Sequence, residues 1–211
     1  MDQKYKRVIS LGNNCEVAGG IMLSGIRDAS YVFDWMETSI EFIYLCFRHG
    51  FEAFKFTSAE NYTAKEGRDS AFYDKSGTGC FYHEGKFSGL GKVLEAKRAK
   101  YQRRVQRFEE VCKEGDVLFV RKTNTDETSY LEKIVAILRK RYTKKFKILL
   151  LVEKKILREG LIGEHIVVQN ISKFKQYYKG VKKILDKVDC PRTETNIEYS
   201  RKFINKIRKE V

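Results

Sequence analysis

The chain has 211 residues, and its 42% hydrophobic and 13% aromatic content is enough for a packed core and excludes a disordered protein. It contains one proline and no Gly/Ser-rich linker, so we expect one domain over residues 1–211. The net charge is +14, divided as −2 in residues 1–91 and +16 in residues 92–211. The basic residues 92–211 suit an anionic partner such as nucleic acid, but we favour solvated, lysine-rich helix faces as their explanation.

The cysteines and the first residues indicate an intracellular protein. The N-terminus has only a short apolar run, unlike a signal peptide, and no apolar stretch is long enough for a membrane span, so we expect a cytoplasmic location. An odd number of scattered cysteines without a secretion signal predicts reduced thiols. No C-x-x-C pair occurs, and we expect no metal and no cofactor. The five are Cys15, Cys46, Cys80, Cys112 and Cys190.

The chain begins with a predicted strand, turn and helix. Residues 6–11 form a short apolar run that ends at a glycine, and from Cys15 onward the apolar residues recur at a spacing of three to four. Asn13 or Asn14 is a good N-cap for this helix. The aromatic residues of 31–35 alternate as in an extended segment. A second helix is predicted over 40–50 with Thr38 or Ser39 as its cap.

Residues 56–91 read as irregular surface with short β pieces, including a strand over 79–84. A long amphipathic helix then covers 90–115, followed by a strand over 116–122, a helix over 127–142 and a strand over 146–153. A further strand is predicted over 164–171 and a last helix over 196–211. Continuously apolar strands joined by a helix favour a parallel sheet buried on both faces. The predicted fold class is therefore α/β, three-layer, with a mainly parallel central sheet and flanking helices.

Sites in such folds gather beyond the carboxyl ends of the strands, and two loops qualify, residues 12–15 and 121–127. Cys15 begins a helix, where free N–H groups and the helix dipole stabilise a thiolate. A reactive thiol also needs a base. Of the three histidines, His49 ends a helix and His165 begins a strand, so we choose His83, in a loop-rich aromatic region, as its partner.

Several polar residues are candidates for binding substrate. The amides of Asn13 and Asn14, with the first N–H groups of the helix, are suited to an oxyanion, although capping alone explains one of them. Asp34 can orient a histidine or accept hydrogen bonds from a backbone turn. A positive charge after a buried strand suits a carboxylate or phosphate, although Arg121 can instead pair with Asp34 or Glu127. The candidates after that strand are Arg121, Thr123, Asn124 and Asp126.

Several enzyme classes lack their motifs in this chain. There is no G-x-G-x-x-G, no G-K-[ST], no D-x-D, no H-E-x-x-H and no G-x-S-x-G. The long helix could touch nucleic acid, but it lacks interleaved exposed aromatic residues. Its basic residues are Lys97, Arg98, Lys100, Arg103, Arg104 and Arg107.

Four sequence pieces together resemble a family: "SLGNNCEVA", "RDASYVFDWM", "FYH" and "VLFVRKTNTDE". They are similar to an uncharacterised microbial and viral family labelled as putative papain-like cysteine peptidases, over about residues 7–152. The resemblance implies Cys15 as the nucleophile and His83 as the general base, followed by the acidic Glu84. It also implies a papain-like two-lobed fold as the alternative, but the β–α–β run of 116–153 suits a doubly wound sheet better.

Three functions are consistent with these features. The first is a thiol-dependent hydrolase or acyl transferase acting on a peptide or another carbonyl substrate, with Cys15 and His83 as its catalytic pair. The second is an α/β transferase acting on a glycan or a phosphorylated small molecule, with a passive Cys15. The third is a module without enzymatic activity that binds nucleic acid or an anionic surface through residues 92–211.

Overall fold

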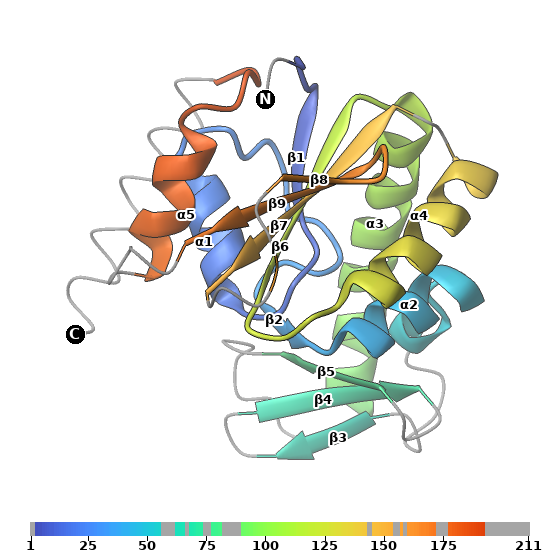
Figure 1. Ribbon diagram of the computed structural model, residues 1–211. Coiled ribbons are helices and arrows are strands. Elements are labelled where there is room, and N and C mark those ends of the chain that lie inside the picture. The colour runs from blue at the N-terminus through green and yellow to red at the C-terminus, as the bar shows by residue number, and fades with distance from the viewer. Residues whose placement is uncertain are drawn as a thin grey trace.

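The structure is a computed structural model, and it describes residues 3–55, 62–65, 68–73, 77–81, 90–142, 145–153, 157, 160–171 and 177–192. Its centre is a five-stranded sheet in the order β1-β6-β7-β9-β8 (Figure 1). The four strands β1 (Arg7–Ser10), β6 (Val117–Thr123), β7 (Phe146–Val152) and β9 (Ile166–Asn170) are parallel, and β8 (Gly160–Ile162) is antiparallel to β9. The predicted α/β fold class is confirmed, and the described residues do not form the papain-like two-lobed alternative.

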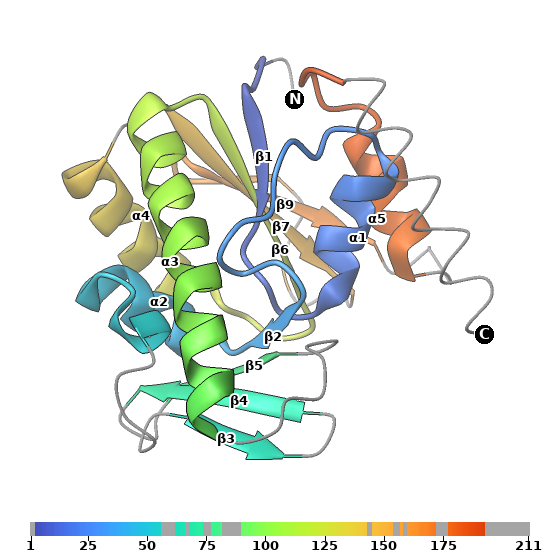
Figure 2. The same cartoon turned by 180° about the vertical axis from the view of Figure 1, so that it is seen from behind.

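Helices cover both faces of this sheet. One face packs against α1 (Cys15–Leu23) and α5 (Tyr177–Leu185), and the other packs against α2 (Ile40–His49), α3 (Leu90–Glu114) and α4 (Thr128–Arg141) (Figures 1 and 2). Successive side chains of each strand point alternately to the two faces of the sheet. In β6, Leu118 and Val120 point to the α1/α5 side, whereas Val117 and Phe119 point to the other side. The unbroken apolar runs are thus explained by burial on both faces.

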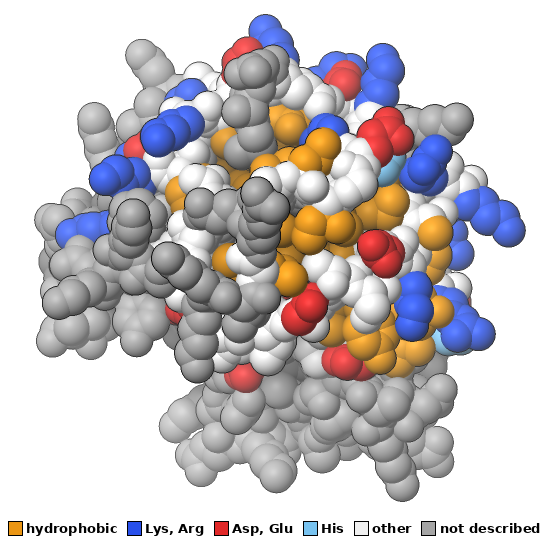
Figure 3. Space-filling view, viewed as in Figure 1, with side chains coloured by type: hydrophobic (Ala, Val, Ile, Leu, Met, Phe, Trp, Pro, Cys, Tyr) orange, Lys and Arg blue, Asp and Glu red, His pale blue; other side chains and the backbone are white. Residues whose placement is uncertain are grey.

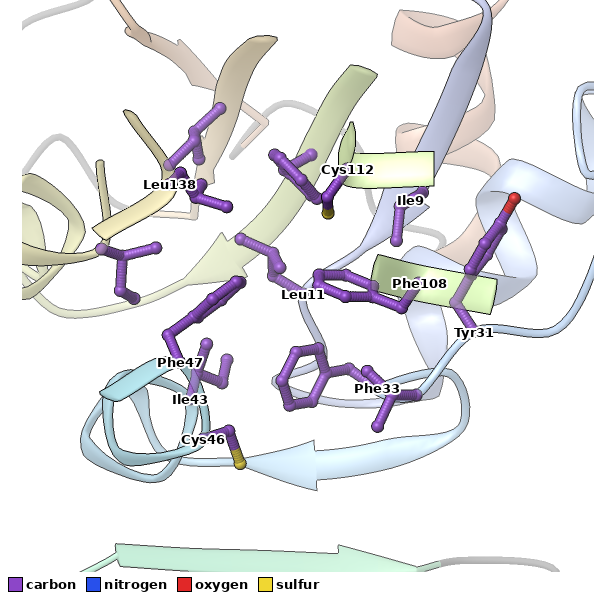
Figure 4. Packing of buried hydrophobic residues seen from close by; sticks show 14 of the residues in the cluster. Ile9, Leu11, Tyr31, Phe33, Ile43, Cys46, Phe47, Phe108, Cys112 and Leu138 are labelled. Atoms are coloured by element: carbon purple, nitrogen blue, oxygen red, sulfur yellow. The ribbon is translucent and has the colours of Figure 1, made fainter. Parts of the chain in front are cut away.

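The core on the α2/α3/α4 side is built around aromatic rings. Phe33 lies with its ring centroid 5.9 Å from that of Phe108 and 6.3 Å from that of Phe47. These rings contact aliphatic residues at the ends of the strands, such as Leu11 (Figure 4). The short 3₁₀ turn η1 (Glu52–Lys55) adds Phe54 to the same cluster. Burial of this many large side chains is the main source of stability for this half of the protein.

A second sheet lies beyond the carboxyl ends of the parallel strands (Figures 1 and 2). It is antiparallel, in the order β2-β5-β4-β3, formed by β2 (Met36–Thr38), β3 (Tyr62–Lys65), β4 (Arg68–Tyr73) and β5 (Gly77–Phe81). The sequence predicted only one of its strands with defined bounds. Because β2 leads directly into α2, this sheet is anchored beside the carboxyl edge of the parallel sheet.

One predicted element differs from the structure, one helix of the structure was not predicted, and one predicted helix lies outside the described residues. Residues 32–35 form a turn rather than an extended segment, because the Asp34 carboxylate accepts a hydrogen bond from the Tyr31 N–H at 3.0 Å and Trp35 has a φ of 64°. Helix α5 was not predicted at all. The helix predicted over 196–211 lies outside the described residues.

Candidate functional site

Two loops at the carboxyl edge of the parallel sheet form the walls of a pocket. The loop after β1 contributes Asn13, the end of β6 and the loop after it contribute residues 123–127, and the start of α2 closes a third side. The pocket has a volume of about 560 Å³. Its lining is mainly polar and consists of Asn13, Glu37, Thr38, Ser39, Ile40, Glu41, Arg121, Thr123, Asn124, Thr125, Asp126, Glu127, Ser129 and Tyr130. The structure therefore brings together five of the predicted substrate-binding residues: Asn13, Arg121, Thr123, Asn124 and Asp126.

Arg121 is buried at the back of this pocket and is fully bonded by the protein. Its Nε and one terminal nitrogen donate to the two carboxylate oxygens of Glu127, both at 2.7 Å. The remaining donors reach the Leu11 carbonyl at 3.1 Å and the Thr38 carbonyl and hydroxyl at 3.1 and 3.2 Å. All five N–H groups of the guanidinium are thereby used. Of the two salt-bridge partners considered for Arg121, the structure selects Glu127.

The charges that line the pocket are mostly negative. Four carboxylates face one guanidinium: Glu37, Glu41, Asp126 and Glu127 against Arg121. Asp126 accepts hydrogen bonds from the Thr128 hydroxyl at 2.6 Å and the Thr128 N–H at 2.9 Å, and these lower its pKa. This lining suits a neutral, hydrogen-bonding group or a cation better than a phosphate.

The loop between β1 and α1 is held in one conformation by Thr38. Gly12 has a φ of 73°, and a Cβ at this position would lie 2.2 Å from the Thr38 hydroxyl oxygen. The same hydroxyl accepts a hydrogen bond from the Asn13 N–H at 2.9 Å, and the Asn13 amide donates to the Lys122 carbonyl. Asn14 caps α1 by accepting from the Glu16 N–H at 2.9 Å. Of the two asparagines proposed as the cap, Asn14 has that role.

Cys15 is the first residue of α1 and is not among the residues that line the pocket. Its side chain is half-buried, and its Sγ lies 3.4 Å from the hydroxyl oxygen of Tyr178 in α5. Burial, followed by the hydrogen bond with Cys15, raises the pKa of Tyr178. Tyr178 was missed from the sequence, because no element was predicted over residues 177–185. A helix signal is nevertheless present there, because Tyr178, Val181 and Leu185 recur at a spacing of three to four with lysines between them, as on one face of an amphipathic helix.

An ion-pair cluster lies on the same face of the sheet as Cys15. Lys122 is buried and bonds to the carboxylate of Glu16 and to that of Glu153, the latter at 2.6 Å. Burial lowers the pKa of Lys122, but the hydrogen bonds with Glu153 and Glu16 raise it to a net value above the ordinary one. Lys122 therefore stays charged, and it neutralises the carboxylate that follows Cys15 in the sequence.

Asp34 lies away from the pocket lining. It is buried and accepts hydrogen bonds from the Arg27 guanidinium at 2.8 Å and from the Tyr31 N–H at 3.0 Å. Burial raises the pKa of Asp34, and the charge of Arg27 opposes this rise. Both contacts hold the turn at residues 31–35, which is the backbone-turn role considered for Asp34 from the sequence.

The three histidines have different surroundings. His83 lies outside the described residues, so its distance from Cys15 stays a prediction. His49 is exposed at the end of α2. His165 is buried, stacks on Phe146 with a centroid distance of 4.3 Å, and places its Nδ1 3.0 Å from the Phe146 carbonyl oxygen. Neither His49 nor His165 contributes to the pocket lining.

The basic residues of α3 are partly used inside the protein. Lys97 is buried, Arg98 donates to the Lys55 carbonyl at 3.0 Å, and Arg107 donates to the Ser30 carbonyl at 2.7 Å. Arg104 lies over the Tyr101 ring at 5.0 Å. On the face shown in Figure 3, the coloured Lys and Arg side chains are spread around the rim rather than gathered in one patch.

The described residues contain neither a cluster that could hold a metal ion nor a helix that could span a membrane. Among the residues that the structure describes, no three His, Cys, Asp or Glu side chains are grouped closely enough to hold a metal ion. Within the same part of the chain, no helix combines the length and apolar character that crossing a bilayer requires.

The fold and site define an α/β protein with a polar pocket at the carboxyl edge of a parallel sheet and a thiol at the start of the adjoining helix. The chain belongs to the family described as "Putative papain-like cysteine peptidase (DUF1796)", whose pattern matches residues 6–155. This match confirms the resemblance identified from the sequence. The comparisons with curated proteins and with solved structures give no match. Helix α5, which carries Tyr178, lies beyond the matched range.

Proposed function

We propose that the protein is a thiol-dependent hydrolase or acyl transferase in which Cys15 is the nucleophile and His83 is the base. One observation carries the proposal: among the four cysteines described, Cys15 alone is not buried, and it stands at the first position of α1. The free N–H groups and dipole at a helix start favour a thiolate. Burial raises the pKa of the Cys46, Cys112 and Cys190 thiols, which makes them poor nucleophiles.

The strand pairing supports His83 as the base. Strand β5 ends at Phe81, which pairs with Met36 of β2, and His83 follows two residues later in the sequence. Strand β2 ends at Thr38, whose hydroxyl bonds to the N–H of Asn13, two residues before the thiol. The chain that leads to His83 is thus attached to the same carboxyl edge as Cys15.

The reaction follows from these groups. His83 removes the proton from the Cys15 thiol, and the thiolate attacks the substrate carbonyl carbon to form a C–S bond and an oxyanion. The donors proposed for this oxyanion are the Cys15 N–H and the side-chain amide nitrogen of Asn14. The side-chain oxygen of Asn14 already accepts the hydrogen bond of the helix cap, so its amide nitrogen is the group left to donate. Collapse expels the leaving group, which takes the proton from His83. Water or an acceptor nucleophile then attacks the thioester and restores the thiol.

Iodoacetamide labelling of the native protein, measured for each cysteine by mass spectrometry across a pH series, tests this proposal. Cys15 should react fastest of the five thiols, with a labelling midpoint below about pH 8.5, the value for an ordinary thiol. His83→Ala should slow labelling of Cys15 near neutral pH, whereas His49→Ala, the matched control at the exposed end of α2, should leave it unchanged. A Cys15 that reacts no faster than the buried thiols contradicts the proposal.

A second candidate function places the chemistry in the pocket and leaves Cys15 passive, and it is favoured by the absence of Cys15 from the pocket lining. In this alternative the protein is an α/β transferase whose ligand is bound by residues such as Asn13 and Asn124. The saturated donors of Arg121 and the surplus of carboxylates favour a glycan over a phosphorylated molecule.

Ligand-induced thermal stabilisation separates the two functions. If the second candidate is correct, neutral sugars should raise the melting temperature of the protein and inorganic phosphate should not. Asn124→Ala should remove the effect, and Cys15→Ser should retain it. Equal stabilisation of the wild type and of Asn124→Ala would mean that the sugar does not occupy the pocket.

A further inference from the structure

Helix α5 approaches α1 unusually closely at two consecutive glycines. A Cβ on Gly19 would lie 2.1 Å from the Tyr178 ring, and a Cβ on Gly20 would lie 2.4 Å from the Val181 side chain. Gly19 is four residues after Cys15, so the two positions share one face of α1. The Tyr178 ring therefore lies over Gly19, and its hydroxyl extends to Cys15.

We propose that Tyr178 is a positioning residue for Cys15, with its phenol hydroxyl donating a hydrogen bond to the Cys15 thiolate. The inference rests on the proposed function, because it assigns a partner to the proposed nucleophile. It extends that function beyond the family's matched residues 6–155, since α5 follows them in the sequence. Tyr178 is the group whose contact with the sulfur the structure records, at 3.4 Å.

The direction of this hydrogen bond follows from the charge of the thiol. While the thiol is neutral, either group can donate, but an ionised sulfur can only accept. Burial raises the pKa of Tyr178, so its phenol keeps its proton at neutral pH. His83 takes the thiol proton, and Tyr178 holds its own proton throughout the reaction. A hydrogen bond donated to the charged form of a group favours that form.

The charged groups on the elements that carry this pair form ion pairs. Glu16 on α1 is paired with Lys122 of β6, which is also paired with Glu153 at the end of β7. On α5 itself, Lys182 pairs with Asp186. The negative charge of Glu16 adds to the rise in the pKa of Tyr178 and thus keeps the phenol protonated. The hydroxyl of Tyr178 is left as the uncharged donor that faces the sulfur.

Tyr178→Phe is the variant that tests the role, because it keeps the ring over Gly19 and removes only the hydroxyl. The measurement is the pH profile of Cys15 labelling by iodoacetamide, with the labelled peptide identified by mass spectrometry. A hydrogen bond to a charged group corresponds to about one pH unit, so we expect the labelling midpoint to rise by that amount. Tyr142→Phe is the matched control, because it removes a phenol that bonds to Glu109 at 3.3 Å on the other side of the sheet.

The outcomes for Tyr178 and for the proposed function are distinguishable. The difference between the Tyr178→Phe and wild-type midpoints decides the role of Tyr178, and a midpoint unchanged from wild type overturns it. The wild-type midpoint and its response to His83→Ala decide whether Cys15 is an activated nucleophile. Urea unfolding of both phenylalanine variants checks that the fold is retained. A shift that occurs equally in Tyr142→Phe is a general effect and also overturns the inference.

Discussion

Arg121 and Lys122 are neighbours in β6, yet their side chains end in separate ion pairs on opposite faces of the sheet. Arg121 is bonded to Glu127 under the pocket, and Lys122 is bonded to Glu16 beside Cys15. Successive side chains of a strand point to opposite faces of the sheet, so this separation follows from the positions of the two residues in β6. Asn13 connects the two sites, because it lines the pocket and donates its amide to the Lys122 carbonyl. A ligand in the pocket and a reacting thiol would thus share one loop.

The first prediction concerns the Arg121–Glu127 pair. Arg121→Ala leaves the buried Glu127 carboxylate without its partner, so we expect the free energy of unfolding to fall by about 3–5 kcal/mol. Urea unfolding, followed by the fluorescence of the single tryptophan, Trp35, measures this change. Replacing Arg121 and Glu127 together by leucine should recover part of the loss. As a control, Arg48→Ala at an exposed position should change stability by less than about 0.5 kcal/mol. A loss this small for Arg121→Ala would contradict the assigned role.

The second prediction concerns the contact between α1 and α5. Gly19→Ala places a methyl group where the Tyr178 ring lies, so we expect a loss of about 1–3 kcal/mol in the free energy of unfolding. In a Tyr178→Ala background the clash is absent, and the same substitution should be neutral or stabilising, because alanine favours a helix more than glycine does. A double-mutant cycle by urea unfolding measures this coupling. Additive effects would show that the ring does not pack on Gly19.

The sequence predicted the parallel sheet well because its signals are local. The apolar runs of β6 and β7, the Ser39 and Asn14 caps, and the glycine after α2 each depend on a few neighbouring residues. The pocket was also predictable in part, because strands of known direction bring the loops at their carboxyl ends together. Five of the seven proposed substrate-binding residues line it for that reason.

The remaining features depend on contacts between distant segments. The Cys15–Tyr178 contact joins residues 163 positions apart, and α5 packs closely on α1 where two glycines leave room for its side chains. The turn at residues 32–35 depends instead on contacts with nearby residues, because Arg27 and the Tyr31 N–H satisfy the Asp34 carboxylate. The alternating aromatic residues indicated a strand, but pairing of a buried carboxylate outweighed that local preference.

The third prediction concerns alkaline pH. Burial, with a smaller contribution from Asp28, raises the pKa of Cys190 from 9.0 to about 11. Below pH 9.0 the thiol is neutral in both states; above it the unfolded chain loses the proton first, so stability falls as the pH rises toward 11. Cys190→Ala removes this pH-dependent contribution to the free energy of unfolding. We therefore expect the stability advantage of the wild type over Cys190→Ala to shrink between about pH 8 and pH 10.5 in urea unfolding. A constant difference would contradict the prediction.

The fourth prediction concerns acid pH and the start of α4. The hydrogen bonds from Thr128 lower the pKa of Asp126 below its ordinary value of 3.8. Its stabilising contribution is therefore present above pH 3.8 and is lost as the pH falls through the lowered value, since the unfolded chain takes up the proton first.

At neutral pH, Asp126→Ala should lower the free energy of unfolding by about 1 kcal/mol, because the Thr128 N–H and hydroxyl lose the carboxylate that accepts their hydrogen bonds. This cost should shrink as the pH is lowered below about 4, where protonation weakens the carboxylate as an acceptor. Asp126→Asn keeps an acceptor oxygen without the charge, so it should lose less stability at neutral pH and show no such acid dependence. Glu132→Gln, at an exposed position of α4, is the matched control and should leave the pH profile of unfolding unchanged. If the cost of Asp126→Ala stayed constant into acid, Asp126 would not be acting through its charged carboxylate.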